Sequence, residues 1–137
     1  MEKITILENE YITMWYYPDE KIIYHQIHTY TPGELFRDFL LRGSEVMEKN
    51  NAAKWLSDER NNQALNTEDL LRVREEDRSW GDTAQAVGWK YWAIVQPEHL
   101  VHKMWLQRIA ERYAQNGGIV RFFAGPDEAM EWLKSRP

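Results

Sequence analysis

The sequence has 137 residues, of which 43% are hydrophobic and 28% charged, and it contains no cysteine. A chain of this length and composition is expected to fold as a single domain over residues 1–137. Without cysteine it forms neither disulfides nor thiolate zinc sites, and this suits a reducing, cytoplasmic location. The N-terminal residues lack the pattern of a secretory signal, and no apolar run reaches membrane-spanning length, so we expect no membrane insertion.

The balance of 17 basic and 22 acidic residues gives a net charge of −5 at pH 7. No run of Lys or Arg forms a stripe that would neutralise phosphates, so nucleic acid is not an expected partner. The chain also lacks a glycine-rich phosphate loop, a nucleophile elbow and a helical zinc motif. We therefore expect a noncatalytic binding protein that uses neither a cofactor nor a metal ion.

The first half of the chain predicts an antiparallel meander followed by a helix. Residues 3–7 and 11–17 are rich in Ile, Thr, Tyr and Trp, and a turn over 18–21 leads into a third strand at 22–27. Thr-Pro-Gly-Glu at 31–34 is a capping box that begins a helix running to about Lys49. The predicted core stripe of that helix contains Phe36, Phe39, Leu40 and Met47, and also Gly43, where a missing side chain allows close approach to a sheet.

The second half alternates strands and helices. Residues 53–57 predict a short strand, 58–62 a polar loop, and Asn66 can cap a helix that continues to about Val87. The apolar run at 90–95 predicts a strand in the middle of the sheet, covered on both faces. An amphipathic helix from 98 to about 115, a strand at 119–123 and a helix opened by Gly125 and Pro126, burying Ala129, Trp132 and Leu133, complete the order.

This order is typical of an α/β fold with a mixed sheet, in which an antiparallel meander is followed by parallel strands and the helices pack on the sheet. The segments Gly-Trp-Lys-Tyr-Trp-Ala-Ile-Val-Gln-Pro at 88–97 and Val-Arg-Phe-Phe-Ala-Gly-Pro-Asp-Glu-Ala-Met-Glu-Trp-Leu at 120–133 resemble bacterial STAS-like proteins, relatives of the anti-sigma-factor antagonists. The resemblance implies a STAS-like sheet used for protein–protein contact, for nucleotide sensing or, in the related lipid-transfer fold, for apolar ligands.

In the antagonists, a phosphorylatable Ser follows an Asp at the start of the helix after the third core strand. The corresponding loop here contains Asp58 but no Ser or Thr before Thr67, and Ser57 precedes the Asp at the end of a strand. No phosphorylation site is therefore carried over. Because ligands of such sheets bind at the carboxyl ends of strands, the loop itself is the candidate binding surface. Its residues are Asp58, Glu59, Arg60, Asn61 and Asn62.

Aromatic residues offer a second candidate site, since seven Trp and seven Tyr are more than a small domain fully buries. Two interpretations remain open: these rings form a dimer interface or an apolar pocket, or they complete the core. The candidates are Trp15, Tyr17, Trp89 and Trp92.

Histidine and acidic residues favour no metal site. His99 and His102 share a helical face but lack a third ligand, and His102 is expected to be a partly buried, hydrogen-bonded ring. His25 and His28 face opposite sides of a strand. The acidic run at 75–77 is typical of a solvated helix face.

Three functions follow in order of preference. The first is a noncatalytic STAS-like module that binds a protein partner or a second copy of itself through the loop at 58–62. The second is a carrier of a small apolar or lipid-like ligand. The third is a small hydrolase that uses Asp58 and a histidine.

Overall fold

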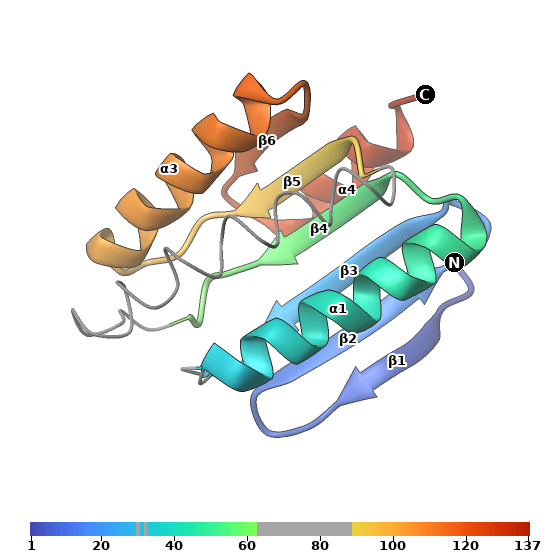
Figure 1. Ribbon diagram of the computed structural model, residues 1–137, viewed down its shortest axis with the longest axis horizontal. Helices are drawn as coiled ribbons and strands as arrows, with labels where there is room; N and C mark the ends of the chain where they lie inside the picture. The colour runs from blue at the N-terminus through green and yellow to red at the C-terminus, as the bar shows by residue number, and fades with distance from the viewer. Residues whose placement is uncertain (30, 32, 63–88) are drawn as a thin grey trace.

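The computed structural model describes residues 1–29, 31, 33–62 and 89–137, whose strands form one six-stranded sheet (Figure 1). Across the sheet the strands follow their order in the chain. They are β1 (Ile4–Glu8), β2 (Ile12–Tyr17), β3 (Ile22–Ile27), β4 (Lys54–Asp58), β5 (Tyr91–Val95) and β6 (Ile119–Phe123). The first three pair antiparallel, and β3 to β6 run parallel to one another. The predicted mixed α/β sheet is thus confirmed.

Tight turns close the antiparallel part of the sheet. The side-chain carbonyl of Asn9 accepts hydrogen bonds from the backbone N–H groups of Tyr11 and Ile12, at 2.8 and 2.9 Å, and so closes the turn between β1 and β2. The turn between β2 and β3 contains Lys21 with a φ of 55°. The predicted helix from Asn66 to Val87 and the acidic run at 75–77 lie outside the described residues.

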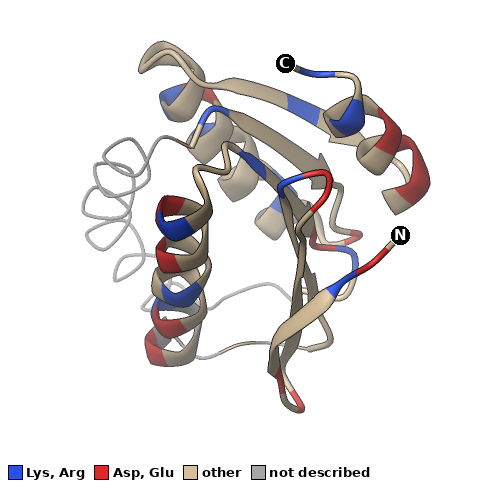
Figure 2. Cartoon of the chain, turned by 90° about the vertical axis from the view of Figure 1, so that its right-hand side faces the viewer, with Lys and Arg blue, Asp and Glu red and all other residues tan. Residues whose placement is uncertain are grey.

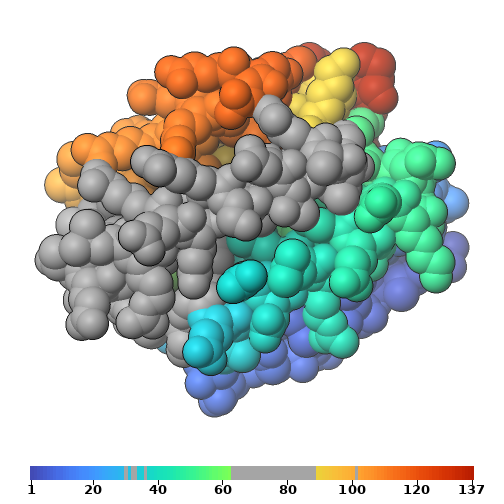
Figure 3. Space-filling view, viewed as in Figure 1, coloured from blue at the N-terminus to red at the C-terminus, as the bar shows by residue number. Residues whose placement is uncertain are grey.

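The three described helices divide between the two faces of the sheet. α1 (Gly33–Asn50) and α3 (Leu100–Gln115) pack on one face, and α4 (Pro126–Lys134) packs on the other (Figures 1 and 2). The space-filling view shows the outer surfaces of α1, in cyan to green, and α3, in orange, on the same side of the molecule (Figure 3). No described helix is long and apolar enough to cross a membrane.

Gly43 lets α1 lie close to the sheet, as the sequence predicts. A Cβ atom at this position would collide with the indole ring of Trp55 on β4 and would lie 3.1 Å from the sulfur of Met14 on β2. Phe39, Leu40 and Met47 of the predicted stripe are buried against the sheet. The side chains of Phe36 on α1 and Val101 on α3 lie outside the described part of the chain.

β5 is buried along its whole length because α3 covers one of its faces and α4 the other. Asn116 caps the end of α3 and Gly117 follows with a φ of 94°, so the predicted glycine stop is confirmed. Gly125 and Pro126 open α4 as predicted. This helix buries Ala129, Met130 and Leu133, whereas Trp132 is only half-buried and packs edge-on against Tyr91 of β5. Trp132 thus packs against the predicted core, but it is only partly buried.

Candidate functional site

Polar side chains gather at the carboxyl ends of β3 and β4, on the face covered by α1 and α3. His25 on β3 lies opposite Ser57 on β4, and Glu59 follows two residues later. Because side chains alternate along an extended chain, Trp55, Ser57 and Glu59 all point to this face. The backbone N–H of Glu59 donates to the carbonyl of Val95 at 3.1 Å, so the strand pairing holds Glu59 in place.

Glu59 is the centre of a buried hydrogen-bonded group. Its Oε1 lies 3.2 Å from Nε2 of His25, and its Oε2 accepts a hydrogen bond from Nδ2 of Asn62 at 2.8 Å. Nε2 of His102, in the first turns of α3, lies 3.4 Å from the same Oε2 and 2.9 Å from Nδ2 of Asn62. On the far side of His25, Nε1 of Trp55 donates to Nδ1 at 2.8 Å. We call these five residues the Glu59 cluster. None of them is more than 3% exposed.

The indole of Trp55 fixes the protonation of His25. An indole N–H only donates hydrogen bonds, so Nδ1 of His25 accepts and carries no proton. The proton of the neutral ring is therefore on Nε2, from which it is donated to Glu59. Phe39 and Trp55 pack against the ring with centroids 4.9 and 5.8 Å away, and this holds its orientation.

The carboxyl of Glu59 is held in its ionised form. Burial raises its pKa, but the interactions with His102 and His25 lower the pKa by more, and the net effect places it well below its usual value. An unpaired buried carboxylate would be strongly unfavourable, so the two rings and Asn62 are what allow a charge at this depth.

The same geometry argues against a metal ion between the two histidines. A metal ligand needs an unprotonated nitrogen facing the metal, whereas Nε2 of His25 carries a proton because Trp55 occupies Nδ1. Among the described residues there is no group of three or more His, Cys, Asp or Glu side chains suited to hold a metal.

Asp58 points to the opposite face of the sheet. Its carboxylate accepts two hydrogen bonds from the guanidinium of Arg60, at 3.0 and 2.7 Å, and one from the backbone N–H of Arg60 at 3.2 Å. Asp58 itself is 2% exposed. The hypothesis of a hydrolase named Asp58 as the partner of a histidine, but the carboxylate that meets histidines is that of Glu59.

The candidate loop therefore has an inner and an outer part. Asp58 is the last residue of β4, and the side chains of Asp58, Glu59 and Asn62 are buried. Arg60 is partly exposed and Asn61 is exposed. Ser57, the hydroxyl nearest to this loop, is buried and accepts a hydrogen bond from Nε1 of Trp92 at 2.8 Å.

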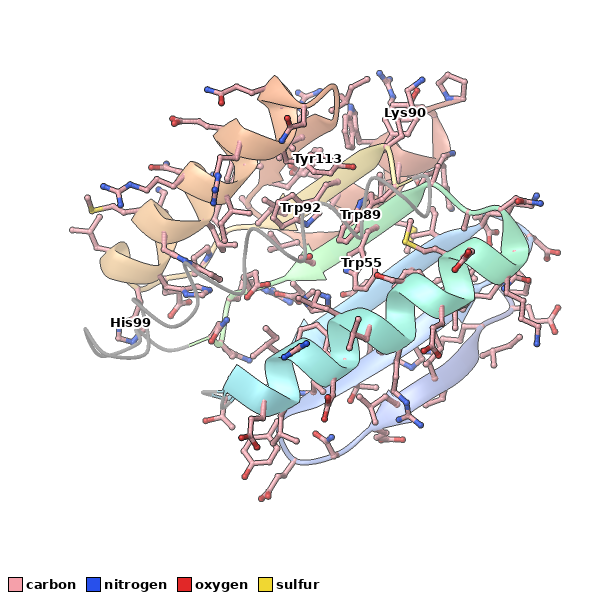
Figure 4. The ribbon with its side chains drawn as sticks, in the orientation of Figure 1. Trp55, Trp89, Lys90, Trp92, His99 and Tyr113 are labelled. Atoms are coloured by element: carbon pink, nitrogen blue, oxygen red, sulfur yellow. The ribbon has the colours of Figure 1, made fainter. Side chains whose placement is uncertain are left out.

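Three of the four candidate aromatic residues are buried. Trp89 stacks on Trp55 at 4.4 Å, and Trp92 and Tyr113 contact Trp89 with ring centroids 5.9 and 6.0 Å away (Figure 4). These rings pack against one another and fill the space between the sheet and the helices on this face. Tyr17 is buried in the core on the opposite face of the sheet, which α4 covers.

Trp15 is half-buried on the face opposite to α1. Its ring meets Tyr24 edge-on at 5.2 Å, and the ammonium of Lys3 lies 4.8 Å from its centre. It is the candidate aromatic residue that retains substantial accessible surface.

His25 and His28 face opposite sides of the sheet as predicted, but His99 and His102 do not share a helical face, because His99 is the N-cap residue that precedes α3. His102 is buried and hydrogen-bonded, while His99 is exposed at the start of α3 (Figure 4). His25 joins the Glu59 cluster, and His28 bonds to Thr13 at 2.7 Å on the opposite face of the sheet. The sequence alone does not predict that His25 and His102 approach the same carboxylate. The alternation of Trp55, Ser57 and Glu59 was the one available signal that Glu59 turns inward.

No known protein family matches this chain, and no curated protein or solved structure is significantly similar to it. The geometry of the site is therefore the basis for a functional proposal.

Proposed function

We propose that this chain is a noncatalytic STAS-like module that binds a protein partner, or a second copy of itself, through the loop at 58–62. The observation that carries the proposal is the inward direction of Glu59 and Asn62. Their bonds to His25 and His102 fix the loop to β3 and α3, and they leave Arg60 and Asn61 on the surface. A loop fixed in this way presents its outer side chains with little loss of entropy on binding.

The internal contacts of the loop favour binding over hydrolysis. Both carboxylates are engaged, that of Asp58 by Arg60 and that of Glu59 by the ring of His25 and the amide of Asn62. A general base needs a reacting proton within hydrogen-bond distance, and Glu59 is too deeply buried to meet a substrate in this arrangement. The stacked Trp rings likewise favour a filled core over an apolar carrier pocket.

The adjoining helix supplies apolar contact area. The first turns of α3 contact the loop through His102, and on the outward side of these turns Leu100 and Met104 are 69% and 58% exposed. A suitable partner surface would combine apolar side chains for this pair with polar groups for Arg60 and Asn61.

Site-specific photo-crosslinking tests the proposal in the cells that make the protein. A photoreactive p-benzoylphenylalanine at position 61 is expected to give a discrete crosslinked product, and the additional substitution Arg60→Glu is expected to reduce it. The matched control places the same group at Glu45, which is exposed on α1. A product of twice the chain mass identifies a second copy, and any other discrete mass identifies a different protein. The same products at both positions, or none at position 61 in a folded protein, would reject the proposal.

A further inference from the structure

The amide of Asn62 lies between two acceptors inside the Glu59 cluster. Its Nδ2 is 2.8 Å from Oε2 of Glu59 and 2.9 Å from Nε2 of His102. If the amide were turned over, its carbonyl oxygen would face the carboxylate oxygen at the same short distance, which is repulsive. The amide nitrogen therefore occupies this place, with one hydrogen for each neighbour.

The second hydrogen of that amide defines the state of His102. It needs a lone pair on Nε2, so the neutral ring carries its proton on Nδ1. Nδ1 is buried and has no hydrogen-bond partner among the described residues. The two histidines of the cluster thus hold opposite tautomers, because Trp55 places the proton of His25 on Nε2.

We infer that the Glu59 cluster is a proton-dependent latch, in which Asn62 fastens the loop at 58–62 to α3 only while Nε2 of His102 carries no proton. When Nε2 takes a proton from solvent, its N–H points at the N–H of Asn62, and that contact becomes repulsive. The charged ring then gains an ion pair with Oε2 of Glu59, 3.4 Å away. Acid therefore exchanges the Asn62 bond for the ion pair, so the loop is then held to α3 through Glu59, and its end at Asn62 is freed from His102.

Few other charges act on this exchange in the described part of the chain. Glu59 faces His102 from the loop, and His25 on β3 lies beyond it on the other carboxylate oxygen. His99 and Lys103 stand beside His102 on α3 itself and are exposed and half-buried. The Asp58 and Arg60 pair is on the opposite face of the sheet.

The consequence for binding rests on the proposed function, since a loop held to α3 through Glu59 instead of Asn62 would present Arg60 and Asn61 differently and weaken partner binding in acid. The latch itself is tested without any partner. Histidine ring nitrogens and backbone amides of the full chain are followed by NMR from neutral to acidic pH. At neutral pH we expect the Nε2–H tautomer for His25 and the Nδ1–H tautomer for His102. On acidification the amides of residues 60–62 should shift with the same midpoint as the His102 ring.

Two substitutions sharpen the test. Asn62→Ala removes the hydrogen bond that favours the Nδ1–H tautomer of His102, so the Nε2–H tautomer should become populated. The chemical shifts of the loop amides should then no longer follow the protonation of the ring. Asn50→Ala is the matched control, because its amide donates to the carbonyl of Val46 within α1, and it should leave both unchanged. An Nε2–H tautomer for His102 in the unaltered protein, or loop amides that do not follow its titration, would overturn the latch. Either result is independent of the crosslinking outcome, so the two proposals fail separately.

Discussion

Replacing Glu59 with Gln tests whether the buried carboxylate stabilises the fold. The carboxylate serves two donors on different oxygens, His25 at 3.2 Å and Asn62 at 2.8 Å. Gln has a single acceptor oxygen, so its amide group must face one of these donors and leave that donor unsatisfied. The shape of the side chain is kept, and the comparison therefore isolates charge and hydrogen bonding.

The expected loss of stability is about 1–2 kcal/mol. One unsatisfied buried donor costs about 1–3 kcal/mol, and the change from charge-assisted to neutral hydrogen bonds costs about 1 kcal/mol more. Gln carries no charge, so the desolvation cost of the buried carboxylate is removed, and this offsets part of the sum by an amount on the order of 1–2 kcal/mol. The loss of hydrogen bonding therefore outweighs the desolvation cost that the substitution removes.

Urea unfolding at pH 7, followed by the fluorescence of the buried Trp residues, measures this difference. The control Glu45→Gln removes an exposed carboxylate on α1 and should change stability by less than about 0.5 kcal/mol. If Glu59→Gln were as stable as the unaltered protein, or more stable, the desolvation of the carboxylate would outweigh its hydrogen bonds. The description of the cluster as stabilising would then be refuted.

Two further changes test the same region. The pKa of Glu59 is lower in the folded protein than its usual value of about 4.3, so its contribution to stability is complete above that pH and is lost as the pH falls below it. Unfolding measured between about pH 5 and pH 2 should therefore be more pH-dependent for the unaltered protein than for Glu59→Gln, and equal slopes would contradict the shift. Gly43→Ala should destabilise the protein by about 1 kcal/mol, because the added methyl group displaces Trp55 at a cost of about 1–3 kcal/mol while helix propensity returns about 1 kcal/mol. A rise in the melting temperature of this variant would show that α1 can move away from Trp55 and the sheet without a loss of stability.

The sequence predicts the elements of this fold well where local signals agree. The amphipathic pattern of α3, the glycines after it and the proline that opens α4 each correspond to one local conformation. The close approach of α1 to the sheet at Gly43 was also predictable, because a glycine within an apolar helix stripe leaves room for a neighbouring element. Trp132 is only partly buried because Met130 fits the same stripe and takes a buried position.

The Glu59 cluster could not be predicted in the same way because it joins distant parts of the chain. His25 and Glu59 are 34 residues apart, and Glu59 and His102 are 43 apart. Only the register of β3 against β4 brings the first pair together, and the packing of α3 brings the second. The aromatic candidates were ambiguous for a related reason, since Trp89 and Trp92 have no local feature that distinguishes a core position from a surface.

The chain-order arrangement of the sheet has a consequence for synthesis on the ribosome. Each strand pairs with the strand translated just before it, so every new strand meets a partner that is already made, and few strand contacts await a distant segment. The Glu59 cluster departs from this rule. His25 and Trp55 can meet early, but His102 arrives only with α3, so the nascent loop acquires its final geometry after the strands on both sides of it have paired.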